Sequence, residues 1–140
     1  MKQEQQNCIF CKIIRGEVPS TKVYEDEKII AFLDIRPITE GHTLVVPKAH
    51  TSGLLDTPGQ TLAELVFAAQ KIGQALVTSL GAEGFNLTCN NGKASGQVVF
   101  HLHFHLIPRR ASDGLSSWPH REYALGEAEK MAEKIKSALQ

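Results

Sequence analysis

The segment that decides both the fold and the chemistry reads His101-Leu102-His103-Phe104-His105-Leu106-Ile107-Pro108. Three of the six histidines in the chain lie within its first five residues. Composition alone would give roughly 0.01 such His-x-His-x-His runs in a chain of this length, so chance explains it poorly. Because side chains alternate along a β-strand, we expect the three imidazoles on one face. Leu102, Phe104 and Leu106 would then lie on the opposite face and enter the core.

A row of imidazoles on a strand has three interpretations. It can be a polar strand face, although Asn, Thr or Ser would serve equally well there. It can supply ligands to a metal, since His-x-His can give two nitrogens to one zinc ion. It can also act in nucleophilic catalysis, because a neutral imidazole can attack phosphorus or acyl carbon and form a covalent intermediate.

The preceding segment, Asn90 to Gln97, is rich in glycine and small polar residues. It can be a hairpin loop with Asn91-Gly92 at the turn. It can also bind an anion, with backbone N–H groups and the Asn and Gln amides reaching a phosphate. A loop of this kind directly before three histidines favours phosphorus chemistry over acyl chemistry.

The rest of the chain predicts an α+β domain with a mainly antiparallel sheet of about five strands. One long central helix is expected to begin at Asp56 or Thr57, with Pro58 in its first turn, and to end at Gly81. A last helix is expected over Gly126–Leu139. The expected strands are Lys22–Tyr24, Lys28–Leu33, His42–Val46, Phe85–Cys89 and Val98–Ile107.

Composition limits the classes of partner. The 140 residues include 15 Lys plus Arg and 15 Asp plus Glu, so the formal net charge is zero. Long nucleic acids and anionic membranes are held by an excess of basic residues, so neither is expected as a partner. No apolar run long enough for a signal or a membrane span is visible, and the cysteine count is odd. We therefore expect reduced thiols and a cytoplasmic location.

The histidine segment, preceded by Gly96-Gln97, resembles the signature of the histidine triad (HIT) superfamily of nucleotide hydrolases and transferases. Four upstream segments are similar to family segments in family order: Cys8–Ile14, Gly16–Pro19, Ala31–Ile35 and Gly41–His50. The resemblance covers about residues 7 to 110 and is closest to the bacterial Hint-like branch. It implies a single HIT domain over residues 1–140, with a C-terminal helical extension from about residue 111.

The resemblance also implies roles for residues. His103 would attack the α-phosphorus of a nucleotide, His105 would contact the phosphate, and His101 would orient His103 through its backbone carbonyl. His42 would lie close to the triad, and Asp34 would hold the ribose hydroxyls. The base pocket would be lined by Phe10, Ile13, Val18, Phe32 and Ile35. The phosphate would be held by Asn90 and by the backbones of Gln97 and Val98, and Gly96 would also belong to the nucleotide site.

The implied activity is cleavage of nucleoside 5′-phosphoramidates or related nucleotidyl substrates through a nucleotidyl-histidine intermediate. The partners would be a purine nucleotide or nucleotidyl conjugate and a second copy of the chain. A dinucleoside polyphosphate hydrolase is an alternative, since Pro108-Arg109-Arg110 is more similar to that branch, whereas Asn90 favours the Hint-like branch. A non-catalytic nucleotide-binding protein is another, because Val98 stands where many relatives carry Ser or Thr.

Cys8-x-x-Cys11 has the spacing of half a tetrahedral zinc site. Bacterial relatives with this cysteine pair imply His50 and His101 as the other two ligands. Four protein ligands would make the zinc structural, and no organic cofactor is expected. A zinc hydrolase in which the metal activates water remains a competing hypothesis.

Overall fold

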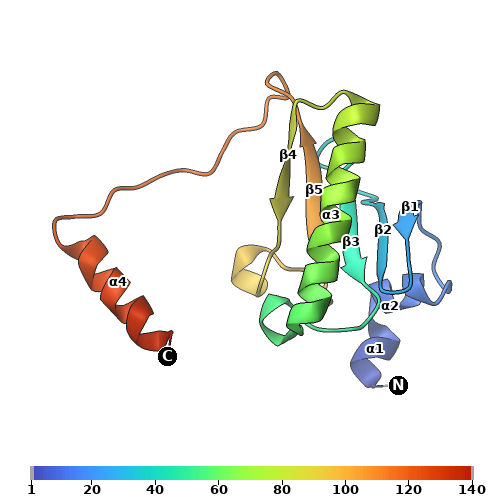
Figure 1. Ribbon diagram of the computed structural model, residues 1–140, viewed down its shortest axis with the longest axis horizontal. Coiled ribbons are helices and arrows are strands. Elements are labelled where there is room, and N and C mark those ends of the chain that lie inside the picture. The colour runs from blue at the N-terminus through green and yellow to red at the C-terminus, as the bar shows by residue number, and fades with distance from the viewer. Residues whose placement is uncertain (1, 140) are drawn as a thin grey trace.

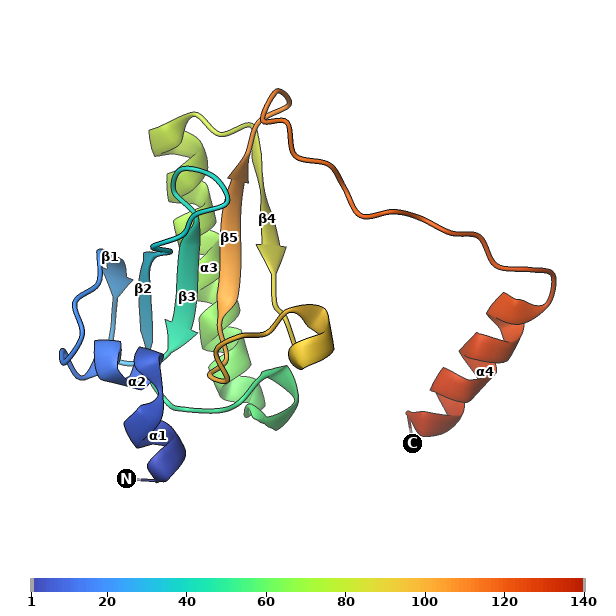
Figure 2. The same cartoon turned by 180° about the vertical axis from the view of Figure 1, so that it is seen from behind.

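The computed structural model describes residues 2–139. The histidine segment leads into β5, which is the second strand from one edge of an antiparallel sheet (Figures 1 and 2). The sheet has the strand order β1-β2-β3-β5-β4, and each neighbouring pair is antiparallel. The strands are β1 (Lys22–Glu25), β2 (Ile29–Leu33), β3 (Thr43–Pro47), β4 (Gly84–Thr88) and β5 (Phe104–Arg109). The helices are α1 (Gln3–Asn7), α2 (Ile9–Ile14), α3 (Gly59–Leu80) and α4 (Glu127–Ala138), with short 3₁₀ turns at Leu54–Asp56 and Lys93–Ser95. The predicted α+β class and five-stranded sheet are confirmed.

The central strands are buried on both faces, because a helix covers each side. Ile29 and Ala31 of β2 face the core cluster under α3, while Ile30 and Phe32 face a second cluster that includes Phe10 of α2. Figure 1 shows the long helix α3 lying across one face of the sheet, and Figure 2 shows α2 on the other. The sheet therefore separates a purely structural face from the face that carries the histidines.

The predicted core side of the histidine segment is confirmed. Leu102, Phe104 and Leu106 all lie in the cluster under α3. The predicted strand boundary is wrong, because β5 begins at Phe104 and not at Val98. The ladder with β3 ends at Val45 and Phe104. Beyond that point the Leu102 N–H donates to the Thr51 carbonyl instead of to a strand.

The start of α3 also differs from the expectation. Pro58 occupies the N-cap, and neither Asp56 nor Thr57 caps the helix. The Asp56 carboxylate instead accepts hydrogen bonds from the N–H groups of Ser52 and Gly53. At the other end Gly81, at φ 64°, ends α3 as predicted, since glycine adopts the left-handed conformation without strain.

The two ends of the chain hold helices of different kinds. The N-terminal helices α1 and α2 were not expected, and α2 presents Phe10 and Cys11 to the interior. The C-terminal helix α4 lies close to the expected range but stands apart from the sheet, joined to it by an extended segment (Figures 1 and 2). None of its described residues is buried. Among residues 2–139, no helix is long and apolar enough to span a membrane.

Candidate active site and metal site

A cavity of about 560 Å³ opens on the α2 side of the sheet. Its walls come from α2, from the end of β2 with the residues that follow it, from the loop after β4, and from the histidine segment. Ten of the twelve sequence-predicted nucleotide-binding residues line it: Phe10, Ile13, Phe32, Asp34, Ile35, Asn90, Gly96, Val98, His103 and His105. Val18 and Gln97 are not among its lining residues. The fold therefore gathers most of the predicted site around one space large enough for a small ligand.

Several residues of the cavity wall were not predicted from the sequence. The additional lining residues are Ile9, Pro19, Ser20, Leu33, Arg36, Leu44 and Val99. Most of them are direct neighbours of predicted residues, so adjacency in the sequence was a usable signal. Leu44 gave no such signal, because only pairing between β2 and β3 brings it beside Phe32.

One ring nitrogen of His103 is hydrogen-bonded to the backbone, and the other keeps a lone pair for a reactant. Its Nδ1 lies 2.7 Å from the carbonyl oxygen of His101. A carbonyl only accepts, so Nδ1 carries the hydrogen and the neutral ring keeps its lone pair at Nε2. The ring of Phe10 meets the imidazole edge-on, with 5.0 Å between ring centroids. Burial lowers the pKa of His103, which favours this neutral form.

His42 and His105 form a hydrogen-bonded chain whose direction follows from one backbone group. The N–H of Ile38 donates to His42 Nδ1 at 3.1 Å, so a neutral His42 carries its hydrogen at Nε2. That Nε2 lies 2.9 Å from His105 Nδ1 and donates to it. The neutral His105 ring must then carry its own hydrogen at Nε2. Since His105 lines the cavity beside His103, with 4.9 Å between their ring centroids, the site combines an acceptor nitrogen with a donor nitrogen.

Burial lowers the pKa of both rings in this chain. The pKa of His105 falls to about 4, mainly through desolvation and further through the nearby His103 and His42. The pKa of His42 is lowered by desolvation, against which the Asp34 carboxylate acts in the opposite direction. Both rings are therefore neutral at physiological pH, as their hydrogen-bond pattern requires.

Asp34 lies next to this chain, with 3.7 Å between its Oδ2 and His42 Nε2. Together with His42 and His105 it forms a group with ligand atoms close enough to hold a metal ion. The hydrogen-bond pattern argues against that use, since His42 Nε2 carries a hydrogen as long as Ile38 donates to Nδ1. Asp34 Oδ1 accepts the N–H of Arg36 at 2.8 Å, so Oδ2 is the oxygen left to meet a ligand.

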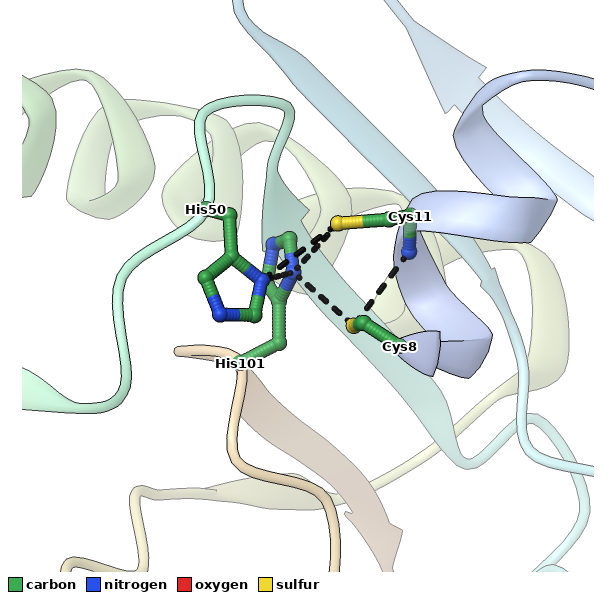
Figure 3. A group of neighbouring side chains, drawn as sticks. All are labelled: Cys8, Cys11, His50 and His101. Carbon is green, nitrogen blue, oxygen red and sulfur yellow. Dashed lines mark hydrogen bonds between the residues drawn. The ribbon is translucent and has the colours of Figure 1, made fainter. Parts of the chain in front are cut away.

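A second cluster consists of Cys8, Cys11, His50 and His101, which converge from the start of α2, the segment after β3 and the segment before β5 (Figure 3). The ligand atoms of all four residues lie within 4.8 Å of one another. His50 Nδ1 and His101 Nδ1 are 3.1 Å apart, and Cys11 Sγ lies 3.3 Å from His50 Nδ1. Cys8 Sγ lies 3.4 Å from His101 Nδ1.

This cluster fits a tetrahedral zinc ion. Zinc–ligand bonds of ordinary length place two nitrogens roughly 3.3 Å apart and a sulfur and a nitrogen roughly 3.6 Å apart. The Nε2–H of His101 donates to the Pro47 carbonyl at 2.7 Å, which leaves the Nδ1 lone pair directed at the cluster. Burial and the neighbouring Cys8 raise the pKa of the Cys11 thiol to about 11, and a bound cation would offset that cost of forming a thiolate.

The two arginines that follow the histidine segment do not line the cavity. Arg109 bonds Asp113 and Asn86, and Arg110 bonds the carbonyl oxygens of Leu80 and Gly81 at the end of α3. Their place in the fold gives them a structural role. They are therefore not placed to contact a ligand in this cavity directly.

The chain is similar to known proteins over most of its length. Adenylylsulfatase HINT3 of Arabidopsis thaliana is 46% identical over 79% of this chain, which spans 56% of that protein's length. Adenosine 5′-monophosphoramidase HNT1 of Candida albicans is 40% identical over 95% of this chain and 91% of its own length.

Two solved structures match nearly the whole fold. The crystal structure of SMU.412c from Streptococcus mutans UA159 matches 96% of this chain and 86% of its own, with a TM-score of 0.90 and 42% identity. A zinc-bound histidine triad family protein from Mycobacterium smegmatis matches 96% of this chain and 99% of its own, with a TM-score of 0.77 and 42% identity. The HIT domain family matches residues 15–112. The chain belongs to the HIT family.

Proposed function

We propose that the chain is a nucleotide hydrolase that cleaves nucleoside 5′-phosphoramidates, or related AMP conjugates, at the α-phosphorus. The observation that carries this proposal is the pairing of His103 Nε2, a free lone pair, with His105 Nε2–H in the wall of one cavity. Relatives named as an adenylylsulfatase and an AMP phosphoramidase support an AMP conjugate as the substrate.

In this proposal His103 Nε2 attacks the α-phosphorus, so that a P–N bond to the enzyme forms while the bond to the leaving group breaks. The leaving group departs with the bonding electron pair and takes a proton from water. A water molecule then attacks phosphorus, releases the nucleotide from His103 and returns a proton to solvent. The His105 Nε2–H donates to a phosphoryl oxygen, where negative charge develops.

The remaining walls of the cavity suit the other parts of a nucleotide. Asp34 Oδ2 can accept both ribose hydroxyls, and Phe10, Ile13, Phe32 and Ile35 offer an apolar surface to the base. The Asn90 amide and the Val98 N–H can donate to phosphate oxygens, whereas the Gly96 N–H already donates to the Lys93 carbonyl. This set holds one phosphate without an excess of basic residues, in agreement with the zero net charge.

The nucleophile is tested with His103→Ala, assayed on an adenosine 5′-phosphoramidate beside the wild type. Turnover should fall by about 10⁴-fold or more, the scale seen when a nucleophile is removed. Mass spectrometry of briefly reacted wild type should show the nucleotidyl adduct, which the variant lacks. His120→Ala, an exposed histidine outside the cavity, is the control and should retain activity. Comparable turnover in His103→Ala would remove this residue as the nucleophile.

The pKa shift of His105 predicts how stability depends on pH. Its folded-state pKa of about 4 lies below the ordinary value of 6.5, so the unfolded chain binds the proton first as pH falls. The neutral ring's contribution to stability is therefore complete above pH 6.5 and is lost progressively between pH 6.5 and about 4. The groups facing the ring are His103, His42 and Asp34.

Urea denaturation at about pH 8, 7 and 5 measures this effect. The unfolding free energy should change little between about pH 8 and 7 and should be lower at about pH 5. In His105→Asn the fall between about pH 7 and 5 should be smaller, because one titrating ring is gone. An equally steep fall in this variant would show that His105 does not supply the effect.

We also propose that Cys8, Cys11, His50 and His101 hold a structural zinc ion, which the zinc-bound relative supports. When bound, zinc would hold the two thiolates and the two neutral imidazoles together and stabilise the fold. Four protein ligands leave no open position for a catalytic water, which argues against the zinc hydrolase hypothesis. Cys8, Cys11 and Cys89 form no disulfide, which is consistent with the proposed cytoplasmic location.

Zinc content per chain, measured by elemental analysis, tests the ligand set. The wild type should hold about one zinc per chain, and Cys11→Ser should lose it together with thermal stability. Cys89→Ser is the matched control, because Cys89 lies outside the cluster, and it should keep its zinc. Equal zinc content in both variants would contradict the assignment. If chelation abolished turnover at once in a protein that is still folded, the metal would have a catalytic role.

We further propose that two copies pair through β4, which is an edge strand. Phe85 and Leu87 on β4 are partly exposed, and Phe67 on α3 is exposed as well. An apolar strand edge of this kind is usually covered by a partner in a stable protein. Antiparallel pairing of β4 with its own copy would satisfy twofold symmetry.

Light scattering after gel filtration should give twice the chain mass of 15.4 kDa for the wild type. Leu87→Lys places a charge on the β4 edge and should shift the protein toward a monomer. The control is Val23→Lys on the opposite edge strand β1, where the side chain is exposed to a similar degree. A monomeric wild type, or equal dissociation by both variants, would rule out the β4 interface.

A further inference from the structure

Gln97 belongs to the loop that faces the cavity, yet its side chain points into the protein. It is 5% exposed and is not among the cavity-lining residues. Its Oε1 accepts the N–H of Gly92 at 2.8 Å, and its Nε2 donates to the carbonyl oxygens of Ser52 at 2.7 Å and Val99 at 3.1 Å. Both donor hydrogens of the amide are used, so this side chain has no hydrogen left to offer a ligand.

These bonds join two segments that are far apart in the sequence. Gly92 and Gln97 flank the short 3₁₀ turn Lys93–Ser95, so the amide closes the loop on itself. Ser52 belongs to the segment that follows the cluster residue His50. The Gln97 bond to Ser52 therefore attaches the loop to the segment that begins at the candidate metal site.

A second contact attaches the same two segments. The Leu54 N–H donates to Asn91 Oδ1 at 2.7 Å. A Cβ at Gly53 would lie only 2.9 Å from that oxygen, so the close approach depends on glycine at this position. The loop is thus held from outside at two points, Asn91 and Gln97.

The held residues alternate with residues that line the cavity. Asn90, Gly96 and Val98 line it, and each is a direct neighbour in sequence of Asn91 or Gln97. A shift of the Gln97 backbone would carry Gly96 and Val98 with it, because they share its two peptide units.

The N–H groups of Gly96 and Gln97 donate to the carbonyl oxygens of Lys93 and Gly92, which leaves the Val98 N–H for a ligand. We propose that Gln97 is a positioning residue, whose side chain holds the Val98 N–H where it can bind the α-phosphate and does not itself touch the substrate. The proposal rests on the proposed function, since it assigns the loop to the phosphate. It accounts for a buried amide with a full set of hydrogen bonds beside a cavity that it does not enter. It also gives the site a way to hold phosphate with a fixed backbone N–H.

Calorimetric dissociation constants of AMP and adenosine test this role, because the two ligands differ only in the phosphate. Gln97→Met keeps the length of the side chain and removes all three hydrogen bonds. It should weaken AMP binding by about tenfold while adenosine binding stays nearly constant. Gln97→Glu keeps the acceptor for Gly92 but loses both donors, and should show the same selective effect if Gln97→Met fails to fold.

Thr43→Val is the matched control. Thr43 is fully buried, and its hydroxyl donates to the Gly41 carbonyl at 2.7 Å, away from the loop. This variant should lower the melting temperature and leave the ratio of AMP to adenosine affinity unchanged. A purely structural role for Gln97 would give the same pattern as this control.

If the Gln97 variants bound AMP and adenosine with equally reduced affinity, or with unchanged affinity, the positioning role would be overturned and the proposed function would remain intact. A wild type that binds AMP no more tightly than adenosine would contradict both, because the cavity would then have no phosphate site. Selective loss of AMP affinity in the Gln97 variants alone is the result expected.

Discussion

The hydrogen bond from His103 Nδ1 to the His101 carbonyl, 2.7 Å long, is the contact on which the rest of the site depends. It determines which nitrogen of His103 keeps a lone pair, and therefore whether the ring can act as a nucleophile. It also joins the two sites, because the His101 ring takes part in the Cys8–Cys11–His50 cluster while its backbone orients His103. One residue thus serves the candidate metal site through its side chain and the candidate active site through its main chain.

The two-sided sheet makes this arrangement possible. Alternate residues of β2 enter separate clusters, so that α3 covers one face and α2 covers the other. Because the core under α3 already stabilises the sheet by apolar packing, the opposite face can carry buried polar groups and a cavity. Every buried side-chain nitrogen and oxygen among the described residues has a hydrogen-bond partner. The polar groups on this face therefore do not carry the free-energy cost of burial without a partner.

Prediction from sequence succeeded where a local pattern was sufficient. The period of two in the histidine segment correctly placed Leu102, Phe104 and Leu106 in the core, and the spacing of apolar residues located α3 and its end at Gly81. It failed at boundaries that depend on distant partners. The residues from Val98 to His103 do not pair with β3. The Leu102 N–H instead donates to the Thr51 carbonyl, and the Pro47 carbonyl accepts a hydrogen bond from the His101 ring. The small helices α1 and α2 gave no periodic signal, since together they contain only eleven residues.

The sequence by itself determined the chemical groups: three alternating histidines, a glycine-rich loop, a Cys-x-x-Cys pair and a neutral overall charge. Tertiary structure alone decided which atom of each group is available. Ile38 sets the hydrogen on His42, and through it the hydrogen on His105, while Gln97 turns away from the cavity to bind Gly92 and Ser52. The reason is physical. A residue type states which hydrogen bonds a side chain can make, but only the positions of its partners in space decide which of them it makes.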